Sequence, residues 1–503
     1  MIGSIGSALI LVPLVAGLAA FWWRDDRSRR VLLLLTATAH LGLTAAAWVR
    51  WHENFISDTP LPIPAGAWVA LDATGLLFLT TVSVLFFACS IYSVGYLARE
   101  KEHTHIDYEE QLFFNNEPEA VFTGCLLLFL ASMTLVCSSQ HFGLLWVGVE
   151  ATTLASAPLI YFHRQHRSLE ATWKYLLICS VGIALALLGN FLLAVAAIDN
   201  NSSTALLVTD LIANASKLHT PWLKVSFLFF LVGYGTKMGL APMHTWLPDA
   251  HSESPSVVSA LLSGALLNCA FLGILRAHQV CVAADSGEFS QQLLRVFGLF
   301  SMTIAAVFIL GQVDFKRMLA YSSVEHMGIL ALGVGLGGAG AFGAGLHAIN
   351  HSLTKACLFL VAGNILAAYE TKAVKDVSGL RRLLPLSGVL WLGGFLSITG
   401  SPPFGTFLSE FTILKAALDA DHTIVAVLYL ALLALIFIGM ANIVLPMAQG
   451  RPRGAVIKSG SGEALWATLP PAMLGLLVLG VGLYLPPTMS AMLHEVATAL
   501  GGK

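Results

Sequence analysis

"LFFLVGYGTKMGLAPMHTWLPDAHSESP", residues 228–255, has the composition of a membrane helix that is interrupted near its middle. A lysine, Lys237, lies within its apolar part. Two glycines and a proline flank this lysine, namely Gly235, Gly239 and Pro242. An ammonium group in hydrocarbon is costly, so a lysine inside a spanning segment is a functional candidate that faces the protein interior. The flanking residues predict a break in the helix beside it.

The composition of the whole chain points to a membrane protein. Of its 503 residues, 56% are hydrophobic and only 11% are charged, whereas soluble domains carry about 25% charged residues. Apolar runs of about 20 residues, long enough to cross a bilayer, recur along the chain. We therefore predict an all-α polytopic protein embedded in the lipid bilayer. The formal net charge of −2 gives no indication of a nucleic-acid partner.

The cysteines do not form a metal-binding pattern. None of the seven belongs to a C-x-x-C pair, so the sequence lacks the usual framework for zinc, haem or an iron–sulfur cluster. We expect no metal and no cofactor in this chain.

The apolar runs correspond to about fourteen spans, and the charges of the loops support this number. With fourteen spans the basic loops all fall on one side, which the positive-inside rule makes cytoplasmic. Both termini are then periplasmic, and "HTWLPDAHSESP" (244–255) is expected to cross the cytoplasmic face as a connection to the next span. The basic loops are 23–30, 163–168, 314–317, 372–382 and 450–458.

A weak internal symmetry divides the chain. A second apolar run, 383–416, also contains a break, at Pro402 and Pro403, followed by an acid, Glu410. Interrupted helices at corresponding positions of two repeats indicate a transport site. Because each repeat has five spans, the repeats must be inverted. We expect an N-terminal three-helix segment (1–118), two inverted repeats that each hold a half-channel (119–280 and 281–450) and a C-terminal helix (451–503).

Ionisable residues inside the spans suggest a route for protons. His347, His351 and Lys355 recur every four residues and therefore share one helical face, drifting by about 40° per step. Buried lysines release protons more readily than exposed ones, nearby carboxylates oppose that release, and histidines relay protons near neutral pH. The predicted proton-translocation residues are Glu150, Lys174, Lys237, His347, His351, Lys355 and Glu410.

Simpler interpretations stay open for several of these residues. Lys174 can extend to the cytoplasmic surface, and Lys415 to the outer one. His347 and His351 can be packing residues. Glu150 and Lys237 can form an inert structural ion pair.

Long motifs show a family resemblance. The stretch 235–264 closely resembles the central motif of antiporter-like membrane subunits, and "MLAYSSVEHMG" (318–328), "LHAINHSLTKACLFLVAGNI" (346–365) and "SPPFGTFLSEF" (401–411) fit as well. This family includes the L-, M- and N-type subunits of complex I, the large subunits of multi-subunit sodium/proton antiporters and the membrane arms of group 4 nickel–iron hydrogenases. Within it, residues 149–185 and 261–276 are most similar to the F-type component of hydrogenase-4.

The resemblance implies fourteen helices, two of them discontinuous, with two inverted five-helix repeats and a polar axis along the membrane midplane. It implies that Glu150 pairs with Lys237 and that Lys174 lies close to that pair. Glu410 is implied to be the terminal exchanging group. The supporting polar residues are His244, Asn268, Glu325 and His326.

Two departures from the family pattern matter. Many members carry a lysine in the eighth span, where this chain has Asn268, so the link between the halves is left to water or to His347. The chain also stops soon after its last span, without the lateral helix of L-type subunits.

The favoured hypothesis is a proton-translocating, non-catalytic subunit of a hydrogenase-4-like or complex I-like oxidoreductase in the bacterial inner membrane. The implied partners are other membrane subunits and soluble subunits that carry iron–sulfur or nickel–iron centres. The alternatives are a subunit of a multi-subunit Na⁺/H⁺ antiporter, the membrane half of an energy-coupled inorganic-carbon uptake complex, and a passive scaffold. Whether the chain works as part of an enzyme is left open.

Overall fold

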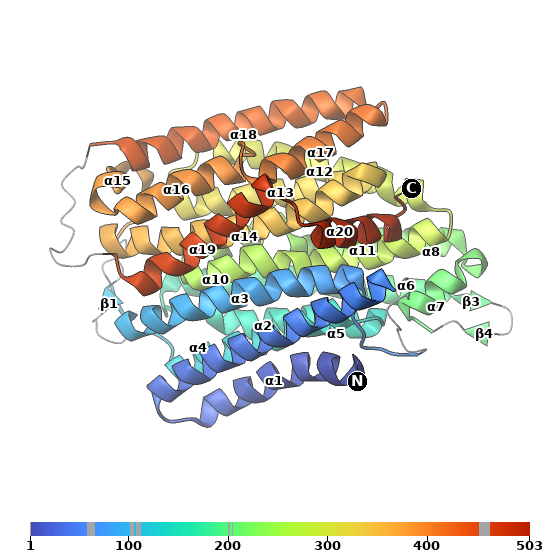
Figure 1. The fold of residues 1–503 in the computed structure, drawn as a ribbon, viewed down its shortest axis with the longest axis horizontal. Coiled ribbons are helices and arrows are strands. Elements are labelled where there is room, and N and C mark those ends of the chain that lie inside the picture. The colour runs from blue at the N-terminus through green and yellow to red at the C-terminus, as the bar shows by residue number, and fades with distance from the viewer. Residues whose placement is uncertain are drawn as a thin grey trace.

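The computed structural model describes residues 2–57, 66–100, 105–106, 112–199, 202–203, 205–451 and 463–502. Most of the expected basic loop 450–458 lies outside these ranges. Within them the chain forms a bundle of long helices that run roughly side by side (Figure 1). Both ends of the described chain lie toward the same end of the bundle (Figure 1).

The helices of the first half, in chain order, are α1 (Ile2–Trp22), α2 (Asp26–Ile56), α3 (Ala73–Glu100), α4 (Glu119–Ser138), α5 (Phe142–Ile160), α6 (His166–Ala196), α7 (Val208–Ala213), α8 (Thr220–Met238), α9 (Trp246–Glu253), α10 (Ser256–Leu261) and α11 (Leu267–Ala283). Those of the second half are α12 (Gly287–Ile309), α13 (Phe315–Leu336), α14 (Gly338–Tyr369), α15 (Leu380–Leu383), α16 (Pro385–Ile398), α17 (Gly405–Asp419), α18 (Thr423–Gln449), α19 (Leu465–Leu483) and α20 (Pro487–Ala499).

Short elements complete the connections. The strands β1 (His105–Ile106) and β2 (Phe113–Phe114) pair antiparallel, as do β3 (Ile198–Asp199) and β4 (Ser202–Ser203). Four short helical turns are η1 (Ala215–Lys217), η2 (Met243–Thr245), η3 (Leu262–Leu266) and η4 (Val374–Asp376). Of these, η3 is a π-helical turn, an element often found at functional sites.

The predicted number of spans agrees with the structure. Among the described residues, thirteen helical segments are long and apolar enough to cross a membrane, with 220–253 (α8 to α9) and 256–283 (α10 to α11) each counted as one. The pair α16–α17, broken in its middle, supplies one more crossing of similar length. The segment that follows residue 450 contains two helices, α19 and α20, where one was expected.

The first break separates α8 from α9. α8 ends at Met238 and is followed by Gly239, whose φ of 85° favours glycine. A Cβ at Gly239 would overlap the side chain of Leu247. Side chains take up backbone groups near the break: Trp246 Nε1 donates to Thr236 O at 2.8 Å, and Ala241 N donates to Ser301 Oγ at 3.0 Å. The carbonyl of Thr236 and the N–H of Ala241 therefore have hydrogen-bond partners within the protein.

The expectation that "HTWLPDAHSESP" is a surface connection was wrong for most of its length. It forms η2 and α9, and Trp246, Leu247 and His251 are buried. The helix resumes because the residues after Pro242 can bury an apolar face against the bundle. The polar residues of α9 reach the basic loops: Asp249 Oδ1 lies 2.8 Å from Arg317 Nη2, and Glu253 Oε1 lies 2.7 Å from Lys372 Nζ.

The second break separates α16 from α17, at the predicted Pro402 and Pro403. Gly400 precedes them with a φ of 62°. A Cβ at this position would overlap Glu410 Oε2. Gly400 therefore leaves room for a buried carboxylate at the break.

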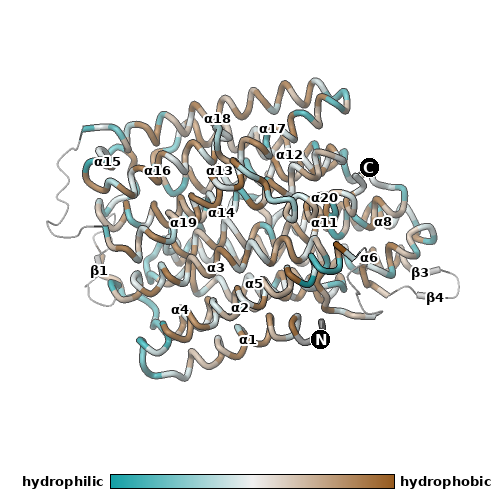
Figure 2. The backbone as a smooth tube through the Cα atoms, viewed as in Figure 1, coloured by the Kyte–Doolittle hydropathy of each residue, from teal (hydrophilic) through white to brown (hydrophobic). Residues whose placement is uncertain are grey.

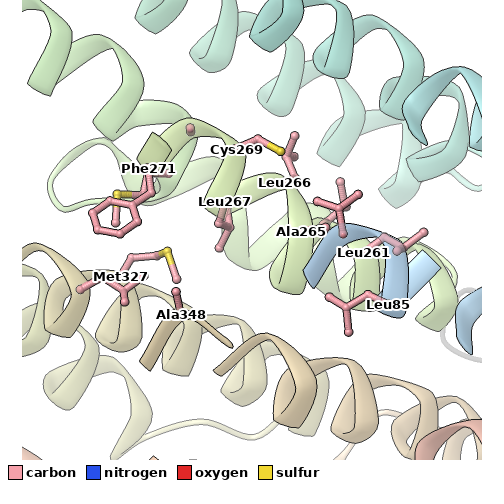
Figure 3. Packing of buried hydrophobic residues seen from close by; sticks show 14 of the residues in the cluster. Leu85, Leu261, Ala265, Leu266, Leu267, Cys269, Phe271, Met327 and Ala348 are labelled. Carbon is pink, nitrogen blue, oxygen red and sulfur yellow. The ribbon is translucent and has the colours of Figure 1, made fainter. Parts of the chain in front are cut away.

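The hydrophobic core is centred on the helices α10 and α11. The spanning window in residues 256–283 is fully buried, whereas those of α1 and α18, at opposite edges of the bundle in Figure 1, are only 28% buried. Figure 2 shows hydrophobic residues along these outer helices, as expected for surfaces that face lipid. In Figure 3, Leu267 and Phe271 of α11 lie close to Met327 of α13 and Ala348 of α14.

A buried ion pair joins α11 to the start of α3. Arg276, with 1% of its side chain exposed, donates from Nη1 and Nη2 to the two carboxylate oxygens of Asp72, each at 2.6 Å. Burial raises the pKa of Asp72, but the charge and hydrogen bonds of Arg276, together with Gly75 N–H, hold that pKa below its usual value.

We predict that Asp72→Asn lowers the free energy of unfolding by about 3 kcal/mol, because it leaves the Arg276 guanidinium buried without a counter-charge. The contribution of a carboxylate with a lowered pKa is present above its unfolded-state pKa of about 4 and is lost as pH falls through the folded value. The melting temperatures of wild type and variant should therefore begin to converge below about pH 4 and become equal only below the lowered folded-state pKa of Asp72. Asp419→Asn, in an exposed pair with Lys415, is the matched control and should change little. Equal melting temperatures for D72N and wild type at neutral pH would contradict the assignment.

Candidate functional site

Lys237 lies at the last turn of α8, beside the first break, and is fully buried. Its Nζ donates to Thr153 Oγ1 at 2.8 Å and to Tyr175 OH at 2.6 Å. The ammonium also lies 4.4 Å from the centre of the Tyr175 ring, an arrangement that stabilises a cation. A buried ammonium is therefore held by two hydroxyl groups and one aromatic face.

Thr153 connects Lys237 to Glu150. Its hydroxyl donates to Glu150 Oε2 at 3.4 Å while accepting from the lysine. Among the described residues, no direct ion pair joins the carboxylate to the ammonium. The expected Glu150–Lys237 pair is thus bridged by a hydroxyl, which makes a donor chain from lysine to threonine to glutamate.

Tyr175 is fixed by Ser156. Ser156 Oγ donates to Thr152 O at 2.7 Å, so its single proton is used there. Tyr175 OH, 2.6 Å from Ser156 Oγ, must therefore be the donor of that pair. The phenol oxygen is left free to accept from Lys237.

Lys174 lies apart from this cluster. Its side chain is 45% exposed and forms ion pairs with Glu170 at 2.7 Å and with Asp249 at 2.9 Å. Consecutive residues of a helix point about 100° apart, so Tyr175, and not Lys174, faces Lys237. The placement differs from the one implied by the family and agrees with the alternative of a surface lysine. Lys415 is likewise exposed, paired with Asp419.

A second cluster lies near the second break. His326 Nδ1 of α13 lies 2.9 Å from His347 Nε2 of α14, and His347 Nδ1 lies 2.9 Å from Ser409 Oγ of α17. Glu410, the next residue on α17, is buried, and one ligand atom each from His326, His347 and Glu410 lie within 4.8 Å of one another. Three helices therefore bring together the two predicted histidines and the predicted acid.

The hydrogen bonds assign the protons of this cluster. Ser409 Oγ donates to Thr406 O at 2.8 Å, so it accepts from His347 Nδ1–H. His347 Nε2 then carries a lone pair, and His326 Nδ1 donates to it when both rings are neutral. The two histidines form an ordered relay that ends at Ser409.

Lys355 and His351 continue the same face of α14 and are fully buried. Lys355 Nζ donates to Leu319 O at 2.5 Å. The His351 ring lies 5.0 Å from the His326 ring, and Glu325 Oε2 lies 4.0 Å from His326 Nε2. Glu325 is the buried acid of this second group, on α13 beside His326.

His251, which the sequence interpretation did not select, lies between the two clusters. It is fully buried on α9, and neither ring nitrogen has a hydrogen-bond partner among the described residues. Its ring lies 6.1 Å from that of Trp246, which in turn lies 5.0 Å from Tyr175 of the first cluster. On its other side it lies 5.7 Å from Phe359 of α14.

The remaining supporting residues occupy different places. Asn268 donates to Ser352 Oγ of α14 at 2.7 Å, so it joins α11 to the helix of the second cluster. His244 is buried at η2, with its ring 6.2 Å from that of Tyr321, a residue that belongs to neither cluster.

Thr153, Tyr175 and His251 were missed by sequence reasoning. Threonine and tyrosine are common in membrane helices as packing residues, so they give no distinct signal. The signal for Tyr175 was its position next to Lys174, and that for His251 was its place in the polar stretch after the break.

We predict that Tyr175→Phe lowers the free energy of unfolding by about 1–3 kcal/mol, since Lys237 loses one of its two acceptors in a buried site. The apparent melting temperature of the purified protein in detergent measures the effect. Tyr484→Phe, at a side chain 66% exposed, is the control. An unchanged melting temperature for Y175F would contradict the role of the phenol oxygen.

The chain matches known membrane proteins over most of its length. Residues 139–437 match the family described as NADH:quinone oxidoreductase/Mrp antiporter, transmembrane. A hydrogenase-4 component F homologue of Methylacidiphilum infernorum is 36% identical over 84% of this chain and 87% of its own length. A Na⁺/H⁺ antiporter subunit A1 of Staphylococcus haemolyticus is 29% identical over 93% of this chain and 58% of its own length.

Solved structures share the fold. A chain of the membrane-bound sulfane sulfur reductase, an archaeal respiratory membrane complex, superposes with a TM-score of 0.85 at 20% identity, covering 99% of both chains. A chain of the Mrp complex from Dietzia gives 0.80 at 22% identity, covering 99% of this chain and 97% of its own. A chain of respiratory complex I from Thermus thermophilus gives 0.74 at 23% identity, covering 95% and 97%.

Proposed function

Because the chain belongs to the NADH:quinone oxidoreductase/Mrp antiporter family of transmembrane proteins, we propose that it is a proton-translocating subunit of a hydrogenase-4-like or complex I-like membrane complex. The observation that carries the proposal is the pair of buried clusters, one beside each helix break. Both contain groups that change charge by gaining or losing a proton, and burial makes their charges costly unless they are matched.

The first cluster moves a proton between Lys237 and Glu150. The ammonium donates to Thr153, and Thr153 donates to Glu150. A proton of the ammonium and the proton of the Thr153 hydroxyl can therefore each shift along an existing hydrogen bond. When Glu150 is charged, it stabilises the proton on Lys237. When that charge is removed, the hydroxyls and the aromatic face alone hold the ammonium.

The second cluster passes the proton toward Glu410. Lys355 and His351 lie on one face of α14, and His326 and His347 form the ordered relay that ends at Ser409. Glu410 follows Ser409 on α17, and its carboxylate lies within 4.8 Å of both histidines. Glu410 also lines a cavity of about 300 Å³ together with Tyr429 and apolar side chains of α17 and α18. His251 provides a buried titratable group between the two clusters.

The division of the chain and its orientation form part of the proposal. The inverted repeats cover 119–280 and 281–450, flanked by the segments 1–118 and 451–503. The basic loops lie at the cytoplasmic face of a bacterial inner membrane and both termini at the periplasmic face. Partner subunits, both other membrane subunits and soluble ones with iron–sulfur or nickel–iron centres, carry the redox chemistry.

A subunit of a Na⁺/H⁺ antiporter is the second candidate, favoured by the similarity to the staphylococcal antiporter subunit. Sodium-dependent proton exchange in vesicles without a redox substrate would support it over the first. The inorganic-carbon uptake complex has no specific observation in its favour.

We predict that Lys237→Ala and Glu150→Ala each abolish proton uptake by vesicles that contain the whole complex, while electron transfer by the soluble partner is partly retained. Both variants remove one end of the donor chain. Lys415→Ala, at an exposed lysine, is the matched control for loss of a positive charge. Normal proton uptake by correctly assembled K237A vesicles would overturn the assignment.

We also predict that Thr153→Val reduces proton uptake by about tenfold to hundredfold, because it removes the hydroxyl that bridges Lys237 and Glu150 while keeping the side-chain shape. Thr153→Ser keeps the hydroxyl and should restore most of the rate. Equal rates for T153V and T153S would mean that water, not Thr153, carries the proton.

A further inference from the structure

The cluster at the second break has the donor set of a metal site. His326 and His347 are buried, as is Glu410, and one ligand atom of each lies within 4.8 Å of the other two. The three residues come from α13, α14 and α17 and converge from different directions. The sequence contains no cysteine-based metal framework, and this set uses imidazoles and a carboxylate instead.

The two imidazoles are poised to exchange a proton for a metal ion. His347 Nε2 carries a lone pair, because its Nδ1–H is fixed by Ser409, and it faces His326 Nδ1 at 2.9 Å. Two nitrogen ligands on a tetrahedral zinc ion lie about 3.3 Å apart, given zinc–nitrogen bonds of about 2.0–2.1 Å. To admit the ion, the two nitrogens must separate by a few tenths of an ångström, and both rings must turn so that the lone pairs converge on it. The proton of His326 must also move from Nδ1 to Nε2, which keeps that imidazole neutral.

One of the proposed ligands has a donor atom that is not used otherwise. Glu410 Oε1 is buried and has no hydrogen-bond partner among the described residues. Ser409 holds the outer nitrogen of His347, the arrangement that commonly orients a metal-bound histidine. Two neutral imidazoles and one carboxylate carry a net charge of −1, so a dication in their midst is partly neutralised.

The ligand types select the class of ion. Imidazole nitrogens suit zinc, copper and nickel, whereas magnesium and calcium prefer oxygen ligands. Three protein ligands leave a fourth position on a tetrahedral ion, which a water molecule commonly takes. Zn²⁺ fits this tetrahedral set without a redox change.

We infer that His326, His347 and Glu410 form a binding site for a transition-metal dication, with Zn²⁺ as the best match. A bound ion replaces the proton shared by His326 and His347 and thereby interrupts their relay. The binding itself does not depend on the proposed function, but the expected inhibition does.

Zinc binding to the full-length chain in detergent or in its native complex tests the site. X-ray absorption at the zinc edge, after removal of excess ZnCl₂ by gel filtration, should show one retained zinc with two imidazoles and oxygen ligands at about 2.0–2.1 Å. A spectrum without imidazole scattering, or no retained zinc, would overturn the inference. This readout needs no variant and is therefore independent of folding defects.

Variants identify the ligands. Glu410→Gln and His347→Gln, each checked for folding by gel filtration, should weaken zinc affinity at least tenfold in calorimetric titration. The control is His494→Gln, because His494 is exposed on α20 and represents the other histidines of the chain. Equal weakening by H494Q, or unchanged affinity in both cluster variants, would identify the zinc as adventitious and would also overturn the site.

Proton uptake in vesicles links the site to function. Zinc should inhibit uptake in the wild type over the same concentrations at which it binds. Uninhibited uptake with zinc bound at the cluster would leave the metal site standing and would remove the His326–His347 relay from the proton route.

Discussion

The cost of a buried ammonium is the constraint on which the first half of the molecule depends. Lys237 has no exposed surface, and its positive charge is held by Thr153, by Tyr175 and by an aromatic face, with the carboxylate of Glu150 one hydroxyl further away. A direct ion pair in a low-dielectric site would hold the proton on the lysine firmly. Placement of a threonine between the two charges weakens their attraction and keeps them connected by hydrogen bonds, which suits a group whose charge must change.

At each helix break, a glycine leaves room for a side chain close to a buried ionisable residue. Gly239 turns the chain at a point where its own Cβ would overlap Leu247. A Cβ at Gly400 would overlap the carboxylate of Glu410, so a glycine is needed there. Side chains form hydrogen bonds with backbone groups at the first break: Trp246 with the carbonyl of Thr236, and Ser301 with the N–H of Ala241. The breaks therefore orient helices and make room for charged side chains, and the nearby hydroxyls and imidazoles provide the hydrogen bonds.

Sequence patterns predicted the fold well because the membrane imposes simple rules. Spans follow from the length of apolar runs, and both breaks follow from glycine and proline within them. Charged residues inside spans marked Lys237, Glu150 and Glu410 because their burial is costly. The contacts of Lys237 could not be predicted in the same way. Thr153 and Tyr175 are uncharged, and the choice between Lys174 and Tyr175 depends on the rotation of α6 relative to α8, which no local pattern specifies. His251 was missed because a polar stretch that forms a buried helix resembles a loop.

The short helix α9 is the physical connection between the two halves. At one end Trp246 contacts Tyr175 and caps Thr236 of α8, so it is tied to the surroundings of Lys237. Further along, His251 faces α14, the helix that carries His351 and Lys355. Because the break separates α9 from α8, α9 can shift without moving α8. A small shift of α9 changes the surroundings of both Lys237 and His251. Asn268 contacts α14 but carries no charge. His251 of α9 is therefore the titratable side chain that connects, through Trp246 and Phe359, the surroundings of both clusters, and Asn268 holds α11 against α14.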